Sequence, residues 1–139
     1  MTSDNEQDEA GAGGAQSMRQ IELMDLLGYI YLRHGQPDKA AVLMAARDVL
    51  APGDARALLT LALAQVRSER PERALDTLER LALIGGVDAG FHLVRAQALQ
   101  ALNRADEAAS AMRAHVAARA AEAEAGAGAA VLAPTGEIR

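Results

Sequence analysis

Apolar and polar residues alternate along the middle of the chain with the period of a helix. Leu27 and Tyr31 are four residues apart, and Leu58 and Leu61 are three apart. Residues at these spacings lie on one face of an α-helix, whereas a half-buried strand would alternate every second residue. The same spacing extends to Met44, Leu78, Leu99 and Met112. The pattern predicts a set of amphipathic helices.

Small residues recur along this helical region with a period of 34. Two independent sets share it, Gly28, Ala62 and Ala96 in one and Ala40, Ala74 and Ala108 in the other. A fixed period of about 20 to 50 residues is typical of repeat architectures. Small side chains allow two antiparallel helices to approach closely. We therefore expect these six residues to lie between packed helices.

The expected helix boundaries follow the same period. Pro37 and Pro71 suit the first helical position, where the missing N–H costs nothing, and Asp54 and Asp88 precede apolar-periodic segments as N-caps do. Ser17-Met-Arg-Gln resembles a capping box and predicts the start of the first helix there. Each repeat is expected to be helix, short turn, helix, with repeats at about 21–54, 55–88 and 89–122.

The flanks differ from this region. Residues 1–16 are rich in acidic residues, Gly and Ala and have almost no large apolar group, which predicts a disordered acidic arm. Residues 125–139 contain Ala-Gly repeats and then Pro-Thr-Gly, which predicts a flexible Ala/Gly-rich tail. The helical domain is expected to span residues 17–124.

Composition and charge exclude several classes of protein. The net charge is −5, the chain has no cysteine, and only three residues are aromatic. The arginines are scattered and the acidity belongs to the flanks, so no basic face for nucleic acid is evident. No apolar stretch approaches the roughly 20 residues that span a bilayer, and the acidic N-terminus does not resemble a secretory signal. We expect a protein of the bacterial cytoplasm without direct membrane insertion.

No residue pattern indicates catalysis, a metal site or a cofactor site. His34, His92 and His115 do not have metal-ligand spacing, and there is no phosphate-binding loop or nucleophile motif. Asp106 and Glu107 are adjacent and so face different directions on a helix, unlike a catalytic pair of carboxylates. The expectation is a protein that is not an enzyme and needs no cofactor.

The first repeat resembles the tetratricopeptide repeat at its signature positions, which are Leu27, Gly28, Tyr31, Gly35, Ala40 and Pro52. The resemblance implies an all-α fold in which three tetratricopeptide-like repeats form a short right-handed solenoid with a concave groove. On the family pattern, the first helix of each repeat lines that groove. The implied partner-binding residues are Tyr29, Leu32, Arg33, Arg56, Leu59, Leu63, Val66, Arg67, Leu93 and Gln97. The alternative is that several of them contact neighbouring helices or an oligomeric partner.

A longer stretch resembles the small type III secretion chaperones of the SctY (YscY) family. It includes Leu27-Gly28-Tyr29-x-x-Leu32-x-x-Gly35 and, later, the segment from Gly90 to Asn103 followed by Asp106-Glu107-Ala108. The resemblance implies a chaperone, peripheral at the secretion apparatus, that binds and solubilises an SctX-like export component. The pair would then dock on the cytoplasmic domain of the export-gate protein SctV.

Two other interpretations remain open at the level of the sequence. One is a chaperone of another type III secretion client, either a needle subunit or a translocator. The other is a general tetratricopeptide scaffold for protein–protein interaction. The sequence also leaves open whether the unpartnered chain forms a homodimer.

Overall fold

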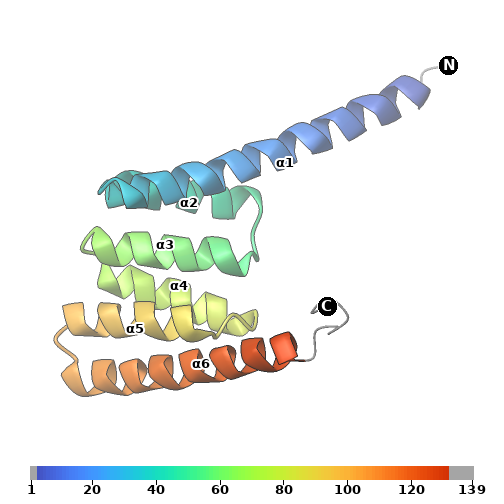
Figure 1. The fold of residues 1–139 in the computed structure, drawn as a ribbon. Coiled ribbons are helices and arrows are strands. Elements are labelled where there is room, and N and C mark those ends of the chain that lie inside the picture. Colours follow the sequence, from blue (N-terminus) through green and yellow to red (C-terminus); the bar gives the residue numbers. More distant parts are fainter. Residues whose placement is uncertain (1–2, 132–139) are drawn as a thin grey trace.

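The computed structural model describes the backbone of residues 3–131 and the side chains of residues 13–128. All regular structure in this part of the chain is helical, as the sequence predicts. Six helices form three successive antiparallel hairpins (Figure 1). They are α1 (Ser3–Arg33), α2 (Pro37–Leu50), α3 (Ala55–Arg67), α4 (Pro71–Leu83), α5 (Ala89–Ala101) and α6 (Ala105–Val131).

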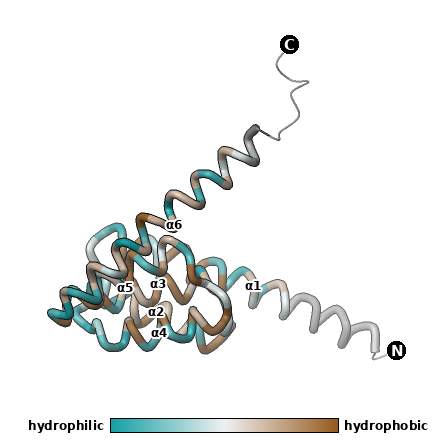
Figure 2. Tube along the Cα trace, turned by 90° about the horizontal axis from the view of Figure 1, so that it is seen from below, coloured by the Kyte–Doolittle hydropathy of each residue, from teal (hydrophilic) through white to brown (hydrophobic). Residues whose placement is uncertain are grey.

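The hairpins stack in chain order. Each helix packs against the next one along the chain, and α3 also contacts both α1 and α5. The first helices of the three hairpins therefore lie next to one another. With 31 and 27 residues, α1 and α6 are about twice as long as the four helices between them. Helix α1 extends beyond the stack in Figure 1, and α6 does so in Figure 2. None of the helices in the described part is long and apolar enough to cross a membrane.

The turn inside each hairpin has the same geometry. Gly35, Glu69 and Asn103 occupy equivalent positions in the three repeats, and all have a left-handed backbone with φ of 70°, 64° and 58°. In each case the N–H of the next residue donates to the carbonyl five residues before it, at 2.8 to 3.0 Å. This is the Schellman arrangement that ends a helix. Glycine adopts it without strain, so Glu69 is the unexpected member of the three.

The helix starts predicted at Pro37, Asp54, Pro71 and Asp88 are confirmed, whereas the start predicted at Ser17 is wrong because α1 already begins at Ser3. Pro37 and Pro71 are the first residues of α2 and α4. The Asp54 carboxylate accepts a hydrogen bond from the Ala57 N–H at 2.8 Å, and Asp88 caps α5 in the same way at 2.9 Å. These caps satisfy amides at the helix N-termini that have no partner within the helix.

The core lies between the hairpins and is built mainly from leucine and alanine. All six small residues of the repeating pattern are buried. Gly28 shows why size matters there, because a Cβ at this position would lie 2.5 Å from the Sδ of Met44. The largest buried cluster joins α3, α4 and α5, and its members are Leu58, Ala62, Leu78, Leu81, Phe91 and Val94.

The structure differs from the sequence prediction at both flanks. Helix α1 begins at Ser3 and passes through Ser17, so the backbone of residues 3–16 is helical where the composition predicts a disordered arm. Helix α6 continues to Val131, well into the segment predicted to be a flexible tail. Once a packed helix exists, extending it needs no further nucleation, and the alanines at both ends favour its growth while the glycines among them oppose it. The rest of the predicted tail, residues 132–139, lies outside the described residues.

Candidate functional site

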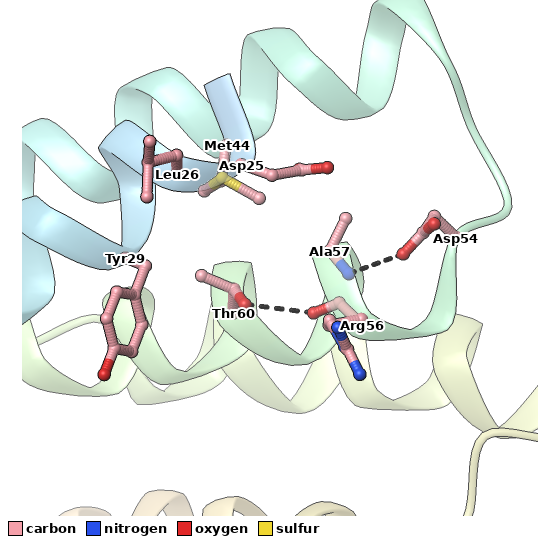
Figure 3. Close-up of a pocket in the computed structure, with 8 residues that line it drawn as sticks. All are labelled: Asp25, Leu26, Tyr29, Met44, Asp54, Arg56, Ala57 and Thr60. Atoms are coloured by element: carbon pink, nitrogen blue, oxygen red, sulfur yellow. Dashed lines mark hydrogen bonds between the residues drawn. The ribbon is translucent and has the colours of Figure 1, made fainter. Parts of the chain in front are cut away.

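A cleft opens between α1 and α3, on the side where the first helices of the hairpins meet (Figure 3). Its volume is about 640 Å³, which lies within the range of pockets that hold ligands or side chains of a partner. Three of the lining residues come from α1, one from α2 and four from α3 and its N-cap. They are Asp25, Leu26, Tyr29, Met44, Asp54, Arg56, Ala57 and Thr60.

The walls of the cleft are largely apolar. Leu26 and Tyr29 are each 54% exposed, although both are large apolar groups on a well-packed helix. Met44 lies deeper and is almost completely buried. The Thr60 hydroxyl donates to the Arg56 carbonyl of its own helix, so this polar group is already satisfied. The cleft therefore presents apolar surface that is not covered by the described residues.

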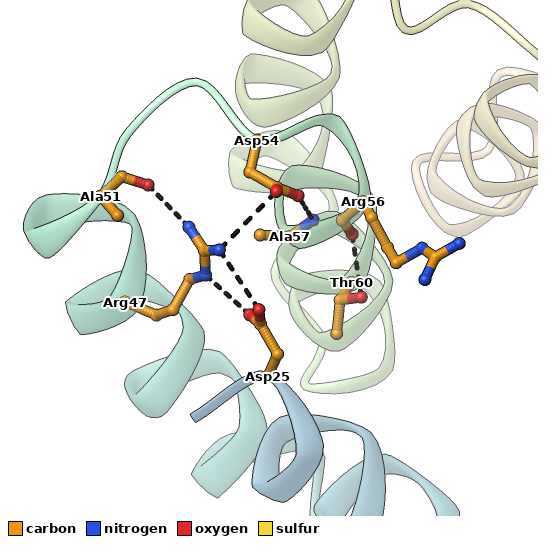
Figure 4. Close-up of polar contacts among 7 residues, drawn as sticks. All are labelled: Asp25, Arg47, Ala51, Asp54, Arg56, Ala57 and Thr60. Atoms are coloured by element: carbon orange, nitrogen blue, oxygen red, sulfur yellow. Dashed lines mark hydrogen bonds and ion pairs between the residues drawn. The ribbon is translucent and has the colours of Figure 1, made fainter. Parts of the chain in front are cut away.

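A polar cluster lies at one end of the cleft and joins the first two hairpins (Figure 4). The guanidinium of Arg47 on α2 donates to both carboxylate oxygens of Asp25 on α1, at 2.6 and 3.2 Å, and to the Ala51 carbonyl at 2.6 Å. The Asp54 carboxylate is 3.7 Å from the same guanidinium. Arg47 is only 4% exposed, and an arginine at such a depth requires compensating partners.

The charge state of this cluster is held by its contacts. The hydrogen bond to Asp25 is the main reason why the pKa of Arg47 lies above the ordinary arginine value. Burial acts in the opposite direction, while the negative charges of the surrounding aspartates raise the pKa further. Arg47 is therefore a permanent cation that links α1, α2 and the start of α3.

The predicted groove residues lie on three neighbouring helices. Tyr29, Leu32 and Arg33 are on α1, Leu93 and Gln97 are on α5, and the rest are on α3. Tyr29 and Arg56 line the cleft together, and Arg33 donates to the Tyr29 hydroxyl at 3.1 Å. The exposed members of the predicted set are Tyr29, Arg33, Arg56, Arg67 and Gln97.

Other members of the predicted set belong partly to the core. Leu32 is buried and packs against small residues of α2 and α3. Leu59, Leu63 and Val66 are partly buried against the large core cluster, and the Leu59 Cδ2 lies 2.9 Å from where a Cβ on Gly90 would be. The alternative, that some predicted groove residues contact neighbouring helices, therefore holds for Leu32, which is buried. It holds in part for Leu59, Leu63 and Val66, which are partly buried.

Some of the residues that shape the cleft were not expected as site residues from the sequence. Leu26 and Thr60 occupy the same position in the first and second repeats, and both line the cleft. Arg47 was also not expected as a site residue, although the repeat pattern of the sequence contains a signal for it. Its counterpart in the second repeat is Leu81, which is buried in the core cluster, so a charged residue at this position indicates a buried ion pair.

Within the described residues, no group of three or more His, Asp or Glu side chains is placed to hold a metal ion. Neither a protein-family model nor a curated protein matches the chain.

Proposed function

We propose that this protein binds and solubilises a partner protein, by holding an apolar helical segment of that partner against α1 and α3. The observation that carries the proposal is the uncovered cleft of about 640 Å³ with Leu26 and Tyr29 half exposed on its wall. Exposed apolar surface of this kind on a small protein marks an interaction site. An amphipathic helix that docks in a groove buries its apolar residues in such pockets.

We further propose that the three hairpins are tetratricopeptide-like repeats and form a short right-handed solenoid. Support comes from features that recur once in each repeat, namely the left-handed turn residues Gly35, Glu69 and Asn103, and from the equivalent caps Asp54 and Asp88. The contacts of α3 with both α1 and α5 also support this arrangement. In a solenoid of this type, the first helices line the concave binding surface.

For the identity of the partner we propose an SctX-like export component of a type III secretion system. This rests on the sequence resemblance to SctY chaperones. The complex would then dock on the cytoplasmic domain of SctV. Of the charged residues that line the cleft, Asp25 and Asp54 face Arg47. This leaves the exposed Arg56 to pair with an acidic residue beside the apolar ones of a partner helix.

The test is co-expression of the chain with candidate clients, namely an SctX-like protein, a needle subunit and a translocator, followed by affinity capture. Tyr29→Asp places a carboxylate in the cleft wall and is expected to remove capture of the client. Leu83→Asp is the matched control, since Leu83 is 86% exposed on α4 and does not line the cleft.

The outcomes separate the parts of the proposal. Capture of a needle subunit or translocator in place of the SctX-like protein would support the cleft as the binding site but show that the client is a different protein. Equal capture by wild type and Tyr29→Asp would overturn the cleft as the binding site. If no client is captured by the folded wild type, the secretion proposal fails and a general interaction scaffold is left.

A further inference from the structure

The two end faces of the hairpin stack carry apolar residues that the repeat pattern buries everywhere else. Met44, Leu78 and Met112 occupy the same position in the three repeats. Met44 and Leu78 are each 1% exposed, whereas Met112 is 42% exposed. Met44 is covered by α3 of the following hairpin, and Leu78 is covered by α5. No helix in the described part of the chain follows α6, so Met112 lacks this cover.

The surface around Met112 is a shallow hollow of about 570 Å³ between α5 and α6. We call it the trailing face and define it by its exposed lining residues, which are Gln97, Gln100, Ala101, Ala105, Ala109 and Met112. Three of these six residues are alanine, and the buried lining residues Ala96 and Ala108 are also small, so the hollow has room for larger side chains. It is the surface on which a further first helix of a repeat would pack.

Helix α1, at the other end of the stack, also exposes apolar residues. Leu23 and Ile30 on α1 correspond to Ala57 and Ala64 on α3, which are buried against the preceding hairpin. Because no described hairpin precedes α1, Leu23 is 54% and Ile30 is 37% exposed. Leu26 lies between them on the same side of the helix. Because Leu26 belongs to the cleft wall, we call Leu23 and Ile30 the leading face.

We propose that the leading face of one copy packs on the trailing face of a second copy. The interface would repeat the contact that the chain already makes twice internally, between α3 and the first hairpin and between α5 and the second. The side-chain sizes also match in this pairing, since large Leu23 and Ile30 would enter a hollow lined by alanines. Pairing two leading faces would instead oppose large residues, and pairing two trailing faces would oppose small ones.

The chain's own residues 132–139 do not suffice to cover the trailing face. Helix α6 carries the chain about 28 Å past Met112 before Val131, at 1.5 Å per residue. Eight residues span at most about 28 Å when fully extended. Residues 132–139 would therefore reach Met112 with no length left to cover it.

The proposed contact uses different surfaces on the two partners, and each copy keeps one free face of each kind. Such an interface is open and adds further copies unless one end is blocked. Repeat proteins avoid this by having polar outer faces on their terminal repeats. The leading face is apolar, and the trailing face is polar only at Gln97 and Gln100. Self-association is therefore expected to increase steadily with concentration.

Two variants test this with analytical ultracentrifugation. The leading variant is Leu23→Glu with Ile30→Glu, and the trailing variant is Ala109→Glu with Met112→Glu. Each is expected to weaken self-association at least about tenfold, because the contact would bury a carboxylate. Val42→Glu with Val49→Glu is the matched control, as both valines are more than two-thirds exposed on α2 and outside both faces.

The decisive measurement mixes the two variants in equal amounts. The leading variant retains a normal trailing face and the trailing variant retains a normal leading face, so a species of two chains should form that grows no further. A trailing variant that associates like wild type, or a mixture that stays monomeric, would overturn the proposal. So would a wild type that stays monomeric at every concentration. Circular dichroism on each variant establishes that it is folded. If a double variant does not fold, one of its two single substitutions is tested in its place.

Discussion

Arg47 offers the most direct test of how the first two hairpins are held together. The side chain is buried, and its guanidinium contacts Asp25, Asp54 and the Ala51 carbonyl. Replacing it with methionine keeps a similar length and apolar stem but removes every polar contact. The substitution therefore isolates the ion pair from the packing of the side chain.

Two limits bracket the loss of stability. Removing one partner of a fully buried ion pair costs about 3–5 kcal/mol, whereas an exposed pair is worth about 0–1 kcal/mol. The carboxylates of Asp25 and Asp54 are 41% and 47% exposed, so both regain water once Arg47 is gone. We therefore expect Arg47→Met to lower the free energy of unfolding by about 2 kcal/mol, between these limits.

Urea denaturation followed by circular dichroism measures the effect. With a denaturant slope of about 1–3 kcal/mol/M, a loss of this size lowers the midpoint by about 1 M. Arg104→Met is the control, because Arg104 pairs with Glu107 and both side chains are about half exposed. Its loss should stay below about 1 kcal/mol. If Arg47→Met were no more destabilising than Arg104→Met, the buried cluster would not link the hairpins as described.

Three further predictions concern local contacts. Asp88→Ala removes the N-cap of α5 and should lower stability by about 1 kcal/mol in thermal unfolding, while Asp88→Asn should retain most of it. Gly28→Val is expected to cost about 1–3 kcal/mol by urea denaturation because its side chain meets Met44, and Met44→Ala in the same chain should recover part of the loss. Glu122→Ala removes a 3.0 Å hydrogen bond from the Ala89 N–H and should speed hydrogen exchange at that amide, with unchanged exchange speaking against the contact.

The parts of the fold that depend on local chemistry could be predicted from the sequence. Pro37, Pro71 and Asp54 mark helix starts through interactions within three or four residues, and the structure places them as expected. The N-terminal end of α1 and the C-terminal end of α6 were not predicted. Composition indicates whether a segment can form a core but not whether a neighbouring helix will extend through it.

The candidate site was predictable to a lesser degree. The resemblance to the tetratricopeptide repeat assigned both Tyr29 and Leu32 to the groove, but the structure exposes the first and buries the second. The difference depends on how far α2 and α3 wrap around α1, which is a tertiary property. The pairing of Arg47 with Asp25 joins residues 22 positions apart, and such a contact is not visible in a helical pattern.

One position of the repeat has a consequence for the order of the hairpins. Arg47, Leu81 and His115 are equivalent in the three repeats, yet Arg47 forms ion pairs, Leu81 packs among apolar residues, and the His115 ring hydrogen-bonds the Ala89 carbonyl at 2.8 Å. The hairpins are consequently not interchangeable units. A chain with the first two exchanged would bring Leu81 towards aspartates and Arg47 into an apolar junction. Each junction thus specifies its own neighbour, and the chain has only one correct sequence of hairpins.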